Sequence, residues 1–112
     1  MNQPHPNIEL PTMQAAATRA CGLLKVLANP DRLLLMCQLS QGELAVGELE
    51  EQLGIRQPTL SQQLGVLREN GLVATRRDGK NIFYSVASPE ALAVMAVLYE
   101  QFCANPGQEP TC

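Results

Sequence analysis

The chain has 112 residues, of which 46% are hydrophobic and 17% are charged, and its formal net charge is -3. This length suits one domain, and the hydrophobic share is typical of a globular protein rather than a disordered one. An average negative charge argues against nucleic-acid binding, but residues 55–80 hold five cations and two acids, which gives a local charge of +3. A basic patch on an acidic body keeps a local phosphate-binding surface.

We expect neither a secretory signal nor a membrane span. Residues 1–13 have no basic start and no apolar core. The longest apolar run, residues 91–99, falls well short of the roughly 20 residues that a spanning helix needs. We therefore expect a cytoplasmic protein. Structural disulfides are rare in that compartment, so the cysteines point to packing, metal binding or redox chemistry; they are Cys21, Cys37, Cys103 and Cys112.

The first predicted elements are an arm and two helices. Residues 1–12 contain three prolines and little that could be buried, so we expect a mobile arm. Apolar residues at three- and four-residue steps predict a helix from about residue 13 to 27. Its many small side chains favour either close contact with a second subunit or an ordinary core helix. Asn29-Pro30 then predicts the start of a helix reaching about residue 40, the central buried helix, with Cys37 in or beside the core.

A helix-turn-helix pattern follows over residues 46–69. A first helix is expected at Val46–Leu53, with a turn at residues 54–57 and a second helix opened by Pro58. Leu60, Leu64 and Leu67 form the predicted buried line of that second helix. Gln62 then points outward, Thr59 and Ser61 flank that outward face, and Gln63 lies nearer its edge. With Gln57 in the turn, these residues are the candidates for reading DNA.

The last predicted elements are a hairpin, a helix and a tail. Asp78-Gly79 between two β-compatible runs, residues 72–77 and 81–86, predicts a hairpin whose tip carries Arg76, Arg77 and Lys80. Ser88-Pro89 predicts the start of a helix that reaches about residue 104 and carries two apolar stripes. This is more apolar surface than its own core needs to bury, which favours contact with a second subunit. Residues 105–112 are expected to be a flexible tail.

Polar residues at a helix start followed by a basic hairpin are typical of a DNA-reading layout. A helix-turn-helix places the start of its second helix in the major groove, where Gln62 and Gln63 can pair with adenine. The hairpin cations would hold phosphates. In a two-fold dimer the two helices lie about 34 Å apart, so the operator should be an inverted repeat of double-stranded DNA. Taken singly, each feature could also be a solvated helix start or hairpin tip.

The segment ELAVGELEEQLGIRQPTLSQQLGVLRENGLVATRRDGKNIFYSV resembles the winged helix of the ArsR/SmtB family of bacterial repressors. The resemblance extends over roughly residues 14–104 and departs at Gln63, where many members carry His. It implies a mainly α fold with a small β-hairpin, a winged helix-turn-helix of order α-α-α-α-β-β-α. It also implies one domain over residues 13–104, dimeric through the first and last helices.

A metal site is not expected. The founding members of the family bind thiophilic metals through a Cys-Val-Cys element, and Ala45 and Gly47 stand at the matching positions here. Other members use His and acidic pairs on the last helix, which has no His in this chain. The single His5 lies in the expected arm, and no closely spaced Cys or His pair exists to start a tetrahedral site.

Cys37 and Cys103 resemble, in position and context, the two cysteines of the BigR/SqrR-type persulfide-responsive repressors of this family. The resemblance implies that reactive sulfur modifies one thiol, that the second closes a disulfide or polysulfide bridge, and that the operator is released. Cys37 taken alone favours the interpretation as a buried small hydrophobe, because free cysteine is among the most buried residue types. Cys21 is expected to have a packing role, and Cys112 is expected to be an accessory thiol of the tail.

Two alternatives stay open: a metal- or general oxidant-responsive repressor of the same family, and a dimeric protein-interaction module whose basic hairpin contacts a protein. Enzymatic function is not expected, because the sequence offers no His-based dyad, no carboxylate pair and no phosphate-binding glycine loop. No cofactor is expected.

Overall fold

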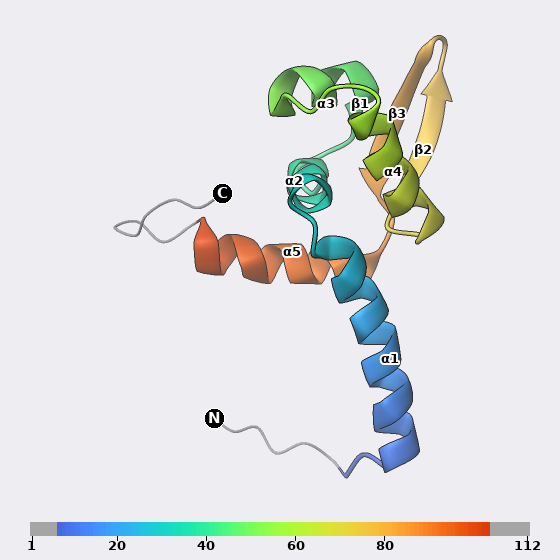
Figure 1. Ribbon diagram of the computed structural model, residues 1–112, viewed down its shortest axis with the longest axis vertical. Helices are drawn as coiled ribbons and strands as arrows, with labels where there is room; N and C mark the ends of the chain where they lie inside the picture. Colours follow the sequence, from blue (N-terminus) through green and yellow to red (C-terminus); the bar gives the residue numbers. More distant parts are fainter. Residues whose placement is uncertain (1–6, 104–112) are drawn as a thin grey trace.

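The computed structural model describes residues 7–103, which form five helices and a small antiparallel sheet (Figure 1). In chain order the elements are α1 (Leu10–Leu27), α2 (Pro30–Leu39), β1 (Leu44–Ala45), α3 (Val46–Leu53), α4 (Thr59–Glu69), β2 (Val73–Asp78), β3 (Asn81–Val86) and α5 (Pro89–Phe102). This order confirms the predicted winged helix-turn-helix. The predicted tail and residues 1–6 of the predicted arm lie outside the described residues.

Two helix ends differ from the prediction by two residues or more. α1 begins at Leu10 rather than at about residue 13, so residues 10–12 are helical and not part of an arm. Pro11 is tolerated there because the N–H groups of the first turn have no partner inside a helix, and a proline therefore loses no hydrogen bond. α5 ends at Phe102, two residues before the predicted end.

The sheet contains a strand that the sequence pattern did not predict. β1 has only two residues, and Leu44 pairs with Tyr84 while Ala45 pairs with Phe83. The strand order is therefore β1-β3-β2, with the predicted hairpin formed by β2 and β3 and closed between Asp78 and Asn81. This pairing attaches the base of the hairpin to the loop that leads into α3.

The core is built around α2, as predicted. Its start is capped by Asn29, whose side-chain oxygen accepts a hydrogen bond from the backbone N–H of Arg32 at 3.0 Å. The largest fully buried side chains come from α2, α3 and α4; they are Leu35, Met36, Leu49, Leu60, Leu64 and Leu67. The three leucines of α4 form the buried line predicted from the sequence.

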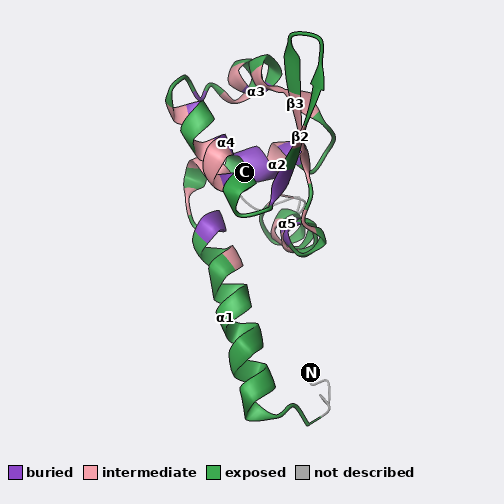
Figure 2. Ribbon diagram, turned by 90° about the vertical axis from the view of Figure 1, so that its right-hand side faces the viewer, coloured by how far each residue is buried: buried purple, intermediate pink, exposed green. Residues whose placement is uncertain are grey.

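α1 projects from the body as a long arm (Figure 1), and nearly all of it is exposed (Figure 2). Only Val26 and Leu27, at its C-terminal end, are buried. Large apolar side chains along the rest face solvent: Leu10 is 62% exposed, Met13 49% and Leu24 53%. A helix of this length with so little burial needs a partner surface to be stable.

α5 buries only the first part of one of its two predicted apolar stripes. Ala91 and Met95 are buried against the core, whereas Leu92 is 45% exposed and Tyr99 57%. Ser88 caps the helix start, accepting a hydrogen bond from the N–H of Ala91 at 3.0 Å. No helix in residues 7–103 is both long and apolar enough to cross a membrane.

Candidate functional site

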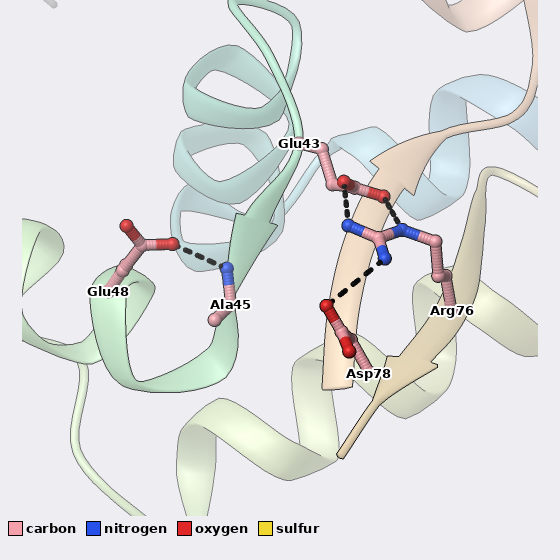
Figure 3. A network of polar contacts seen from close by, with 5 residues as sticks. All are labelled: Glu43, Ala45, Glu48, Arg76 and Asp78. Atoms are coloured by element: carbon pink, nitrogen blue, oxygen red, sulfur yellow. Dashed lines mark hydrogen bonds and ion pairs between the residues drawn. The ribbon is translucent and has the colours of Figure 1, made fainter. Parts of the chain in front are cut away.

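The helix-turn-helix consists of α3, the turn at residues 54–58 and α4. The turn needs Gly54, which has a φ of 72° at the end of α3, a conformation that side-chain-bearing residues rarely adopt. At the start of α3, the carboxylate of Glu48 accepts a hydrogen bond from the backbone N–H of Ala45 at 2.8 Å (Figure 3). Helix α4 begins at Thr59, one residue after the predicted opening at Pro58.

The predicted base-reading residues divide into two groups by exposure. Gln57, Ser61 and Gln62 are exposed, whereas Thr59 and Gln63 are half-buried. The side-chain oxygen of Gln57 accepts a hydrogen bond from the N–H of Ser61 at 3.1 Å, so this residue also caps the start of α4. All five lie at the start of one helix.

Gln63 is engaged within the protein by Arg32, a residue that the sequence pattern did not single out. Nη1 of Arg32 donates a hydrogen bond to Oε1 of Gln63 at 2.9 Å, and Nε of Arg32 donates to the backbone oxygen of Val26 at 2.6 Å. Arg32 thus joins the end of α1 to the recognition helix. Because 31 residues separate Arg32 from Gln63 in the chain, no local pattern carries a signal for this contact.

The hairpin, or wing, holds its three cations in different environments. Arg76 lies between the carboxylates of Glu43 and Asp78 (Figure 3), with Nη2 of Arg76 at 2.7 Å from Glu43 and Nη1 at 3.9 Å from Asp78. Its guanidinium also lies 4.6 Å from the ring centroid of Phe83. Arg77 and Lys80 are exposed, and neither forms an ion pair within residues 7–103.

Glu43 is a second residue that sequence reasoning missed. The hydrogen bond from Arg76 lowers the pKa of the Glu43 carboxyl below its ordinary value, and the positive charge of Arg76 acts in the same direction. Glu43 therefore stays ionised and keeps Arg76 turned toward the base of the wing.

The predicted thiol pair lies along one groove. Cys37 on α2 and Cys103 after the end of α5 both line a groove of about 900 Å³ between these two helices. The other lining residues are Leu34, Gln38, Ser40, Gln41, Leu92, Met95, Ala96, Tyr99 and Glu100. Sγ of Cys37 lies 3.9 Å from Sδ of Met95, which forms the buried side of the groove.

Cys37 and Cys103 are not joined to each other. Cys21 and Cys37 are free thiols, whereas Cys103 is disulfide-bonded, so its bond does not lead to Cys37. Partial burial raises the pKa of the Cys37 thiol above its ordinary value of 9.0, because desolvation disfavours the thiolate. Cys37 is therefore predominantly a neutral thiol near pH 7.

Residues 7–103 contain no cluster of three or more His, Cys, Asp or Glu side chains arranged to hold a metal ion. Ala45 and Gly47, which stand where the founding members of the predicted family have cysteines, lie in β1 and at the start of α3.

Comparison with known proteins places the chain in a family. Residues 29–75 match the model described as "Bacterial regulatory protein, arsR family". The chain is 59% identical over 97 residues to the biofilm growth-associated repressor of Agrobacterium fabrum, covering 87% of this chain and 83% of that protein. The fold is similar to the crystal structure of the repressor BigR from Xylella fastidiosa, with a TM-score of 0.80, 51% identity and coverage of 88% of this chain and 100% of that one.

A more distant structure is the winged helix-turn-helix domain of Mb0332 from Mycobacterium bovis, which is described as homodimeric and DNA-binding. It matches with a TM-score of 0.69 and 30% identity over 80% of this chain and 82% of that one. These relatives are regulators of transcription and not enzymes. With its helix-turn-helix, its wing and this level of identity, the chain belongs to the ArsR family of bacterial regulatory proteins.

Proposed function

We propose that this protein is a homodimeric transcriptional repressor that releases its operator when reactive sulfur bridges Cys37 and Cys103. The observation that carries the proposal is the shared groove: two cysteines far apart in sequence line one groove between the core helix α2 and the helix α5. The close relatives named as repressors support the regulatory part.

The DNA-binding surface consists of the start of α4 and the wing. Exposed Ser61 and Gln62 suit contacts with base edges in the major groove, with Gln57 and Thr59 beside them. Arg77 and Lys80 are exposed cations without an ion pair in the described chain, which suits contacts with phosphates. Arg76 is held by Glu43, and its main part is to set the position of the wing.

The dimer uses α1 and α5. Leu10, Met13 and Leu24 follow three- and four-residue steps along an otherwise solvated helix, and the second stripe of α5 is exposed as well. Covering these side chains with a second copy removes apolar surface from water, which is the main favourable term in association. Two-fold symmetry would present two α4 helices to an inverted-repeat operator.

The sensing chemistry transfers one sulfur atom at a time. A persulfide RSSH gives its outer sulfur to a cysteine thiolate, forming Cys–S–SH and releasing RSH. The second cysteine thiolate attacks the inner sulfur and expels hydrosulfide, which closes a disulfide. If both cysteines are persulfidated first, the outer sulfur of one attacks the inner sulfur of the other, and a trisulfide forms with the same leaving group.

The groove also suits transmission to the DNA-binding surface. α2 contacts α5 on one side and α4 on the other, so a bridge between Cys37 and Cys103 acts on a helix that packs directly against the recognition helix. A coupling of only about 1–3 kcal/mol is enough to change operator occupancy several-fold.

The test combines intact-mass measurement with DNA binding on protein that has first been fully reduced. Persulfide treatment should add sulfur between Cys37 and Cys103 in the wild type and weaken operator binding. Cys37→Ser and Cys103→Ser should each lose the bridge and keep binding DNA, whereas the control Cys21→Ser should respond as the wild type does. Operator release by zinc or arsenite with no response to persulfide would establish the metal-responsive alternative instead.

A further inference from the structure

The half-buried side chain of Arg32 is held by two hydrogen bonds. Its Nε donates to the Val26 carbonyl at the end of α1, and its Nη1 donates to Oε1 of Gln63 on α4. The Arg32 backbone N–H is held by the Asn29 cap as well. Such a guanidinium has little freedom to move, so the amide of Gln63 is held by a rigid partner.

This contact determines which atom of Gln63 remains for DNA. A guanidinium has N–H donors and no acceptor, so Gln63 must turn its carbonyl oxygen toward Arg32. A glutamine that pairs with adenine needs both amide atoms at the base edge, with the oxygen accepting from N6 and the nitrogen donating to N7. With its oxygen held by Arg32, Gln63 keeps its –NH₂ group for an outside partner.

We infer that Gln63 reads DNA as a hydrogen-bond donor, and that Arg32 is the positioning residue that imposes this. The inference rests on the proposed DNA-binding function. The bases that suit such a donor present acceptors in the major groove: guanine offers N7 and O6, and thymine offers O4. Adenine is disfavoured because N7 is its only acceptor in the major groove, and its N6 amino group is a donor that meets no acceptor on Gln63.

The neighbouring glutamine provides an internal contrast. Gln62 is exposed, and its side chain makes no hydrogen bond within residues 7–103. Gln62 therefore keeps both amide atoms for a base and can pair with adenine. Two adjacent residues of one type thus read different bases, because only one of them is bound by an arginine of the protein itself.

The experiment is selection of binding sites from a library of random-sequence DNA duplexes by the full-length reduced protein. For the wild type we expect guanine or thymine at the position read by Gln63. Arg32→Ala frees the Gln63 oxygen and should shift that one position toward adenine, on the order of 10-fold, while the other positions stay unchanged. The control Gln38→Ala removes a hydrogen bond between α2 and α3, at 2.6 Å from Gln52, and should leave the preference as in the wild type.

A second variant keeps the test decisive if Arg32→Ala does not fold. Gln63→Glu retains an acceptor for Arg32 and has no donor, so its preferred base should move to cytosine, whose N4 is a donor. Selection of the same base at every position by wild type, Arg32→Ala and Gln63→Glu would overturn the inference and leave the proposed function intact. If the wild type enriches no sequence at all, the proposed DNA-binding function fails and the inference fails with it.

Discussion

Arg76 donates two hydrogen bonds to the carboxylate of Glu43, one from Nε at 3.0 Å and one from Nη2 at 2.7 Å. The two residues are 33 positions apart, and the pair joins β2, the first strand of the wing, to the loop before the helix-turn-helix. β1 and β3 make the same connection through the backbone. The wing therefore has a defined orientation relative to α3 and α4. Arg76 holds that orientation, whereas Arg77 and Lys80 form no ion pair within residues 7–103.

This separation predicts different salt dependence for the three cations of the wing. Arg77→Ala and Lys80→Ala should each lower operator affinity and reduce the slope of log K against log salt by about 0.9, the value for one lost phosphate contact. Arg76→Ala should change the slope less, because Glu43 already neutralises Arg76. Affinity measured at several salt concentrations checks this. An Arg76→Ala slope change as large as that of Arg77→Ala would mean that Arg76 leaves Glu43 for DNA.

The exposed face of α1 predicts a dimer that a single charge disrupts. Leu24→Glu introduces a carboxylate into the apolar row near the C-terminal end of α1, where dimerisation would bury it, and should convert the protein to a monomer with strongly reduced operator affinity. Lys25→Glu places the same charge at the next residue, away from that row, and should leave the dimer intact. Sedimentation or light scattering gives the mass. A dimeric Leu24→Glu protein would remove α1 from the interface.

Adjacent leucines of α2 predict contrasting losses of stability. Leu35 is completely buried, so Leu35→Ala should lower the free energy of unfolding by about 2–5 kcal/mol through lost transfer energy and the cavity left behind. Leu34 is 39% exposed and Leu34→Ala should cost clearly less, although the chemical change is the same. Denaturant titrations of the reduced dimers at one protein concentration measure both. Equal losses would place the core on a different face of α2.

Burial of Cys37 predicts a pH effect of definite sign. Because the pKa of Cys37 is raised in the folded chain, the folded state holds the proton more tightly than the unfolded state. This contribution to stability is fully present below the unfolded pKa and is lost as pH rises through the folded pKa. Alkylation of Cys37 should accordingly require a higher pH in the folded protein than in the denatured one. The rates, followed by mass in a Cys21→Ser background, test this, and a lower folded pKa would contradict it.

Much of the fold was predictable because its signals are local. Asn29-Pro30, Asp78-Gly79 and Ser88-Pro89 are start and turn signals that act within a few residues, and all three stand at the predicted element boundaries. The buried line of α4 followed from helical periodicity alone. The start of α1 was misplaced because Pro11 was interpreted as a breaker, whereas a proline is also compatible with the first turn of a helix.

The contacts that refine the candidate site were not predictable in the same way. β1 is too short to leave a pattern, and it exists because β3 supplies partners for Leu44 and Ala45 about 40 residues later. The Arg32–Gln63 and Glu43–Arg76 pairs join residues that only the packing of α2, α4 and the sheet brings together. The thiol pair was expected from family resemblance, and the groove now gives that expectation a physical location.

Local sequence signals account for the order of the elements, the helix-turn-helix with its basic wing, and the types of side chain at the start of α4 and on the wing. These properties depend on periodicity, caps and turns, in which each residue interacts with near neighbours. The tertiary structure decided which of those side chains stay available. It holds the oxygen of Gln63 on Arg32, pairs Arg76 with Glu43, and places Cys37 and Cys103 along one groove. Hydrogen-bonding capacity belongs to a residue type, but its use depends on partners that only the folded chain brings within about 3 Å.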